Sequence, residues 1–291
     1  MKILLIGHSI IDHFEELNSE ISKPGGIFYS ALGILSLVKP EDEIFLLTGW
    51  NQKTIHLFEK LYSKANLTFA NKVEEMPEVL LKTSGEGERE EIYKNLSSKL
   101  SIDRVNDWNQ FNGILINMIT GFDISFDQLK TIRKNFKGTI YFDVHTLSRG
   151  VDANMEREFR PIPQIREWLS NIDILQCNEN ELKTIVQGKD EFNCAEEIFQ
   201  FGPQIIIITK GEKGVRTFFL ENRGIKSLFL KAEQVDAINK IGCGDIFGAV
   251  FFYSYISNGD VNKSLISANK AGAMAAAAKN LAFKREIKLN D

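Results

Sequence analysis

Short, uninterrupted apolar runs recur along the chain, and the stretches between them have helical periodicity. The runs are ILLIG (3–7), IFLLTG (44–49), ILIN (114–117), TIYFDV (139–144), DILQCN (173–178) and IIIIT (205–209). A continuous apolar run of this length is typical of a strand that is buried on both faces, as in a parallel sheet. The alternation therefore predicts an α/β fold: a doubly wound, mostly parallel sheet flanked by helices, with right-handed crossovers.

Two regions depart from this alternation, residues 12–24 and 67–96. In the second, VLLKT and EIYKN flank the turn-rich SGEGERE, which predicts a β-hairpin. Because ligands of such sheets bind beyond the carboxyl ends of the strands, these excursions are expected to form a small β lid over the site. A further hairpin is predicted over residues 215–230, followed by helices at 243–257 and 262–280.

Composition narrows the classes of function. The 291 residues are 43% hydrophobic, enough for a large core, and contain no repeat or polar linker, so a single domain over 1–291 is expected. The 35 Lys and Arg are scattered and do not exceed the 39 Asp and Glu, so a small molecule is a better partner than nucleic acid or a membrane. With three dispersed cysteines and too short an apolar N-terminal run for a signal peptide, a cytoplasmic location is expected.

The segment INKIGCGDIFGAV (238–250) places an aspartate between a glycine turn and a wholly apolar stretch. A helix that begins near Gly242 presents unpaired N–H groups and partial positive charge, so the amides of Gly242, Cys243 and Gly244 are candidates to bind a phosphoryl group. Asp245 follows in the first turn, where it can accept a proton from an attacking hydroxyl. A tight turn before a buried helix explains the same residues, with Cys243 as a small side chain filling that turn.

NKIGCGDIF (239–247) resembles the signature D-T-T-G-A-G-D-x-F of the ribokinase (PfkB) family of carbohydrate and nucleoside kinases. The resemblance implies that Asp245 is the base that deprotonates the acceptor hydroxyl and that the three preceding amides form an anion hole. Asn239, Lys240 and Ile241 replace the first three residues of the signature, in a region that contributes to a monovalent-cation site in some members. Weak potassium activation is therefore expected, and the Lys240 ammonium is a hypothetical substitute for that ion.

Two earlier segments resemble motifs that bind the substrate in this family. GHSIID ends in Asp12 and resembles the family's first strand and turn, whose aspartate holds substrate hydroxyls. KPGGIFYSALGIL resembles the glycine-pair signature, so that Gly25 and Gly26 would lie against the substrate, with Ser30 where the family usually has Asn. An aspartate in a turn and glycines before a helix are the plainer explanations of the same residues.

An Asn and a Glu three residues apart suggest a metal site. NENEL (178–182) resembles the family's N-x-x-E motif, which organises magnesium and phosphate through water. Magnesium keeps much of its hydration, so Glu181 with Asn178 is sufficient beside nucleotide phosphates. The same spacing is that of a helix capping box, and both explanations stay open.

Two further segments resemble motifs that bind the nucleotide in this family. IIIITKGEKGV resembles the family's buried strand followed by T-x-G-x-x-G, which lies along the nucleotide and is matched by Thr209, Gly211 and Gly214. SANKAGAMAAAA resembles the late helix that carries an Asn beside the adenine, here Asn269, although close helix packing also explains its small residues. With Asn178, these residues imply ATP and Mg²⁺ as cofactors.

Taken together, the motifs imply an ATP-dependent kinase that transfers the γ-phosphoryl group to a hydroxyl of a sugar, cyclitol or nucleoside. The alternative is a non-catalytic protein that keeps this fold and senses a polyol or nucleotide, as the departures at 239–241 and Ser30 suggest. A nicotinamide-dependent oxidoreductase is disfavoured because no GxGxxG follows the first strand, and a P-loop kinase because no GxxxxGK[ST] occurs. Arg89 and Arg149 are candidate contacts for phosphate or substrate, and the lid hairpin makes a homodimer through the lid possible.

Overall fold

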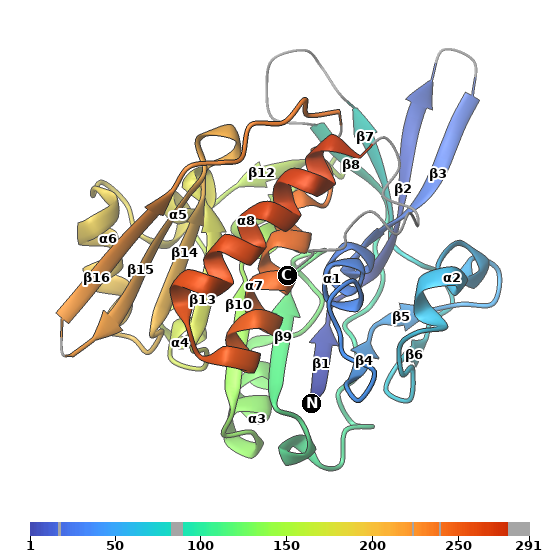
Figure 1. Cartoon of the computed structure of the whole chain (residues 1–291). Coiled ribbons are helices and arrows are strands. Elements are labelled where there is room, and N and C mark those ends of the chain that lie inside the picture. Colours follow the sequence, from blue (N-terminus) through green and yellow to red (C-terminus); the bar gives the residue numbers. More distant parts are fainter. Residues whose placement is uncertain (17–18, 83–89, 223, 239, 279–291) are drawn as a thin grey trace.

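The computed structural model describes residues 1–16, 19–82, 90–222, 224–238 and 240–278. Its central sheet contains β1 (Lys2–Ile6), β4 (Glu43–Leu47), β9 (Gly113–Asn117), β10 (Thr139–Asp143), β13 (Ile174–Asn178), β14 (Ile205–Thr209), β15 (Val215–Glu221) and β16 (Gly224–Leu230). Their order is β16-β15-β14-β13-β10-β9-β1-β4 (Figure 1). The six apolar runs are confirmed as the parallel strands, and the hairpin predicted over residues 215–230 is confirmed as the antiparallel pair β15–β16.

Helices cover both faces of this sheet because neighbouring residues of each strand point to opposite sides. Leu5 and Leu115 belong to the core that contains α1 (Ile27–Leu35), α7 (Cys243–Asn258) and α8 (Val261–Ala277). Leu4 and Ile114 belong to the opposite core, with α3 (Phe126–Asn135), α4 (Ile165–Leu169), α5 (Glu179–Ile185) and α6 (Glu191–Phe199). The doubly wound α/β prediction is confirmed.

The two excursions join in one lid sheet beside the carboxyl ends of the central strands (Figure 1). It consists of β2 (Ser9–Glu16), β3 (Ser19–Gly26), β7 (Glu78–Lys82) and β8 (Glu90–Asn95), in the order β3-β2-β7-β8. β2–β3 and β7–β8 are antiparallel hairpins, and β2 and β7 join them as a parallel pair. Both predicted excursions therefore contribute strands to the lid, but residues 67–77 of the second lie outside the lid sheet, and Asn71–Lys72 pairs with Gly49–Trp50 instead. Residues 17–18 and 83–89 fall outside the described residues.

Several short elements had no sequence signal. They are α2 (Glu59–Tyr62), β5 (Gly49–Trp50), β6 (Asn71–Lys72), β11 (Arg149–Val151), β12 (Arg157–Phe159) and four 3₁₀ turns (Ile55–Leu57, Trp108–Gln110, His145–Ser148 and Gly211–Lys213). The β11–β12 hairpin is antiparallel and lies against the lid, because the Tyr93 amide in β8 donates to the Met155 carbonyl at 2.9 Å. This contact joins the lid to the core.

α7 is apolar on all sides because it is enclosed by α1, α8 and the sheet, and its residues 246–253 are buried. It starts directly after Gly242 and ends at Gly259, both in the left-handed conformation. The predicted helix start is thus confirmed, and the first turn with Asp245 is held by a fixed helix. None of the helices in the described residues is long and apolar enough to cross a membrane.

Candidate active site

A cavity of about 40 Å³ lies between the lid and the first turn of α7. Its polar lining is Asp12 from β2, Glu91 from β8, His145 after β10, Arg157 from β12 and Asp245 from α7. Aliphatic side chains of the lid and the core fill the space around them. The carboxyl ends of the central strands and the lid therefore enclose one polar cavity, as expected for a doubly wound sheet.

Asp245 is oriented from the sheet by an asparagine that the sequence motifs did not single out. Asn117 ends β9 and is 1% exposed; its Nδ2 donates to Asp245 Oδ1 at 2.6 Å and to Ser30 Oγ at 3.2 Å. Ser30, predicted to bind substrate, thus lies beside the bond that fixes the candidate base. The available signal was a polar residue at the carboxyl end of the apolar run ILIN.

The turn that precedes Asp245 is held by two further contacts. Gln176 Nε2 donates to the Gly244 carbonyl at 3.2 Å and to Asp143 Oδ2 at 2.7 Å. Gly242 has φ 73°, and a Cβ there would lie 2.3 Å from the ring of Tyr29. The predicted anion-hole residues Gly242, Cys243 and Gly244 therefore sit at a helix N-terminus whose position is fixed.

The predicted substrate-side residues meet on the opposite wall. Asp12 is 5% exposed and lines the cavity with Gly26, and the Tyr29 hydroxyl donates to Asp12 Oδ2 at 3.4 Å. A Cβ at Gly25 would lie 2.2 Å from the Asp12 carboxylate, so this contact between β2 and β3 requires glycine. The glycine pair and the aspartate are thus brought together, as the resemblance implied.

Asn178 and Glu181 form the capping box that the sequence left open. The Asn178 side chain accepts from the amides of Asn180 and Glu181, and Glu181 Oε2 accepts from the Asn178 amide at 2.8 Å. Within the described residues, no three or more His, Cys, Asp or Glu side chains are grouped to hold a metal ion. Glu181 with Asn178 would suit a magnesium ion that keeps its water ligands and is bound mainly through donor phosphates.

His145 joins this carboxylate to the cavity. It has φ 28°, rare for a residue other than glycine, and its Nδ1 lies 3.9 Å from Glu181 Oε1. Burial opposes protonation, but the carboxylates of Glu181, Asp245 and Asp143 outweigh it and raise the pKa of His145 to about 9. Burial also raises the pKa of Asp143 well above its usual range, although His145 acts in the opposite direction.

We expect this histidine to make stability depend on pH. Its pKa is higher in the folded chain than the usual 6.5, so its stabilising contribution is complete below pH 6.5 and is lost as the pH rises toward about 9. Asparagine tolerates positive φ, so the His145→Asn variant should lack this decline. Denaturant unfolding of both proteins in EDTA across pH 6 to 10 measures the difference, and parallel curves would contradict the assignment.

The residues predicted to bind the nucleotide lie at the end of β14, in the turn that follows it and on α8. Thr209 ends β14, and Gly211 and Gly214 are in the turn to β15, with φ 54° and 116°. Asn269 Nδ2, on α8, donates to the Lys231 carbonyl at 2.9 Å, which ties α8 to the segment after β16. The two regions border the first turn of α7 from the sheet and from the helical layer.

Charged side chains around these loops are paired. Lys210 Nζ is bound by Glu179 at 2.9 Å and by Glu191, and Lys240 Nζ lies 2.8 Å from Glu212. The Lys240 ammonium, suggested as a substitute for a monovalent ion, thus forms a surface ion pair across two loops. Of the other open residues, Arg149 lies 3.8 Å from Glu91, and Asn239 and Arg89 fall outside the described residues.

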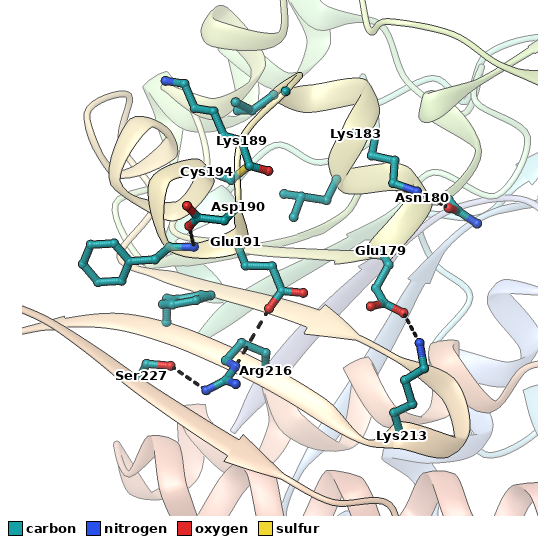
Figure 2. A pocket seen from close by; sticks show the side chains of 15 residues that line it. Glu179, Asn180, Lys183, Lys189, Asp190, Glu191, Cys194, Lys213, Arg216 and Ser227 are labelled. Carbon is teal, nitrogen blue, oxygen red and sulfur yellow. Dashed lines mark hydrogen bonds and ion pairs between the residues drawn. The ribbon is translucent and has the colours of Figure 1, made fainter.

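A larger cavity, of about 840 Å³, lies on the other side of the donor loops, between α5, α6, β15 and β16 (Figure 2). Four of its charged groups form two ion pairs: Lys213 with Glu179 at 3.6 Å, and Arg216 with Glu191 at 3.9 Å (Figure 2). Its lining includes neither Asp12 nor Asp245. The smaller cavity is therefore the candidate active site, because it brings the two carboxylates together.

Comparison with known proteins agrees with this geometry. Residues 145–287 match the model of the pfkB family carbohydrate kinases. Cytidine kinase of Thermococcus kodakarensis is 31% identical over 91 residues (31% of this chain, 32% of that protein). ATP-dependent ribose-1-phosphate kinase of Halopiger xanaduensis is 28% identical over 110 residues (38% of this chain, 34% of that protein). The matched segments span about a third of the length of these relatives.

Solved structures show the same fold over nearly the whole chain. A pyrophosphate-dependent kinase of the ribokinase family, complexed with a pyrophosphate analogue and myo-inositol, superposes with a TM-score of 0.77 at 14% identity, covering 98% of both chains. Aminoimidazole riboside kinase from Salmonella enterica gives a TM-score of 0.76 at 17% identity, covering 96% of this chain and 94% of that one. The chain has the ribokinase-like fold, and its residues 145–287 resemble the pfkB family carbohydrate kinases.

Proposed function

We propose that this chain is an ATP-dependent kinase that phosphorylates a hydroxyl group of a sugar, cyclitol or nucleoside. The observation that carries the proposal is the position of Asp245: it extends from the first turn of a buried helix into a cavity that Asp12 also lines. The names of the relatives, cytidine kinase and ribose-1-phosphate kinase, support the same class of reaction.

In this mechanism Asp12 holds the acceptor and Asp245 takes the proton of the attacking hydroxyl. The hydroxyl oxygen forms a bond to the γ-phosphorus in line with the breaking bond to the β-phosphate oxygen, and ADP leaves. The amides of residues 242–244 stabilise the charge on the transferred group, because a helix N-terminus presents fixed N–H donors to it. Closure of the lid excludes water, which would otherwise compete with the acceptor.

For the donor, we assign the nucleotide to Thr209, Gly211, Gly214 and Asn269, with Asn178 at its phosphate end. When bound, magnesium neutralises charge on the phosphates, and Glu181 and Asn178 would hold its water ligands. The surface pair Lys240–Glu212 joins the two loops that border this donor site. Weak potassium activation and a homodimer through the lid stay predictions.

A coupled assay of ADP release tests the proposal. With ATP and Mg²⁺, we expect one class among pentoses, hexoses, inositols and nucleosides to be phosphorylated with a kcat/KM of at least about 10⁴ M⁻¹s⁻¹, the low end of enzyme values. A parallel series with pyrophosphate in place of ATP, measuring phosphate release, tests the donor. Binding of a polyol or nucleotide without ADP formation from any acceptor would favour the non-catalytic sensing protein instead.

A further inference from the structure

We propose that the buried ion pair Glu91–Arg157 selects the acceptor, and that it selects a compact, uncharged ring polyol of the size of a pentose or cyclitol over a nucleoside or an anionic sugar. This inference rests on the proposed kinase function, whose acceptor class it narrows. It assigns a specificity role to two residues that lie far apart in the sequence and belong to different parts of the fold.

The pair forms one wall of the cavity that contains Asp12 and Asp245. Arg157 Nη1 lies 2.6 Å from Glu91 Oε2, and the two side chains are 5% and 6% exposed. Arg157 Nη2 also donates to the Ile119 carbonyl at 3.2 Å, and its guanidinium lies 4.4 Å from the centre of the Tyr93 ring. A planar guanidinium held on three sides has one orientation, as a selective contact requires.

The wall is fixed to the lid and to the core together. Glu91 belongs to β8 of the lid, and Arg157 to β12, which follows the central strand β10. Beside the ion pair, the Tyr93 amide donates to the Met155 carbonyl at 2.9 Å, and Ile92 pairs with Glu156 as an antiparallel bridge. A bulky acceptor would have to break these contacts before the lid could close over it.

The chemistry of the lining matches hydroxyl groups. A hydroxyl both donates and accepts, so it can bind a carboxylate and a cation together, and the cavity has both kinds on two walls: Glu91 with Arg157, and Asp12 opposite His145. Val79 and Leu81 of the lid offer apolar surface to the C–H groups of a ring. A phosphate or carboxylate on the acceptor would meet three carboxylates, those of Asp12, Glu91 and Asp245, against two cationic groups, His145 and Arg157, and Arg157 is already paired with Glu91. This balance disfavours an anionic sugar.

The size of the cavity points the same way. One water needs roughly 10–15 Å³ of this kind of volume. The 40 Å³ between lid and core therefore holds only about three or four waters, so the lid must move outward to admit any ring acceptor. Because the wall is tied to both sides, this movement favours a compact ring over a nucleoside, which would require a larger one.

The test combines two conservative variants with a set of acceptors. Glu91→Gln keeps the shape of the side chain and removes its charge. Arg157→Lys keeps the charge and removes the planar guanidinium. We expect each variant to raise the acceptor KM by about tenfold to a hundredfold, because a hydrogen bond to a charged group is lost. The ATP KM should change by less than about twofold. Monodeoxy analogues add a second readout: the analogue lacking the selected hydroxyl should bind weakly to the unmodified protein and lose nothing further in the variants.

Arg216→Lys is the matched control, since it alters an Arg–Glu pair that lies outside this cavity and should leave the acceptor KM unchanged. Preference for a nucleoside or sugar phosphate by the unmodified protein would overturn the inference, even if either variant failed to fold. So would an unchanged acceptor KM in both folded variants. In either case, Asp245-dependent ADP release would still uphold the kinase function; no ADP release from any acceptor would remove both proposals.

Discussion

Replacing Asp245 with Asn is expected to lower kcat by about a hundredfold to ten-thousandfold, the range that a positioned general base contributes. Asn has nearly the same shape and still hydrogen-bonds, but its amide cannot take the proton of the acceptor hydroxyl. Because Asn117 and Gln176 hold the first turn of α7 from the sheet, the turn should keep its position in the variant. Steady-state ADP release measures kcat, and calorimetric titration with ATP should give a Kd within a few-fold of the unmodified protein.

Asp127→Asn provides the control for this experiment. Asp127 is also an acidic residue in the first turn of a helix, α3, but it is exposed and does not line the cavity. The control therefore removes a first-turn charge without touching the proposed chemistry, and its kcat should be unchanged. Full activity of Asp245→Asn would remove the proposed base, and an equal loss in both variants would point to an effect of charge alone.

The framework of the fold could be predicted because each central strand is one continuous apolar segment of the sequence. ILIN and IIIIT are apolar throughout because both faces of the central sheet are covered. This pattern can be recognised without knowing which strands are neighbours in the sheet. The hairpin β7–β8 was predicted from the turn-rich segment between its strands, whereas residues 12–24 were predicted only as an excursion from the sheet. The β11–β12 hairpin was not, because strands of three residues are too short to show alternation.

The site was predictable only where its residues share a motif. Gly242 to Asp245 lie in one turn, so their joint position follows from the local backbone. Asn117 reaches Asp245, and Arg157 reaches the cavity, through the order of the strands, which places the end of β9 beside α7 and β12 beside the lid. Arg157 has no local sequence signal, and the polar residue at the end of ILIN does not show which side chain Asn117 contacts. The contact that orients the candidate base and the wall that faces the acceptor therefore required the structure.

The capping box shows a second limit of prediction from the sequence, because one spacing can fit two roles. The spacing of Asn178 and Glu181 satisfies two explanations, and the structure confirms the cap because both side chains bond the first turn of α5. The cap also fixes the direction of the Glu181 carboxylate, whose second oxygen faces His145. A structural role and the proposed magnesium role are therefore compatible, since the first positions the group that the second requires.

Gly242→Ala should be the most damaging change to the turn before Asp245. A side chain at φ 73° costs roughly 1–2 kcal/mol, and a Cβ 2.3 Å from the Tyr29 ring forces that ring to move. The Tyr29 hydroxyl donates to Asp12, so the displacement should also disturb the acceptor wall. We expect a loss of at least about 2 kcal/mol in the free energy of unfolding, which lowers Tm by at least about 3 °C in a chain of this length, and a higher acceptor KM.

Gly244→Ala is the control that distinguishes this effect from a general intolerance of substitutions at the start of α7. Gly244 lies two residues further along the same turn, has no positive φ, and a Cβ there would meet nothing within 4 Å. Its Tm should match that of the unmodified protein, since alanine also favours the helix. Thermal unfolding of the two variants decides the point: an unchanged Tm in Gly242→Ala would mean that Tyr29 and the left-handed turn do not fix the position of Asp245.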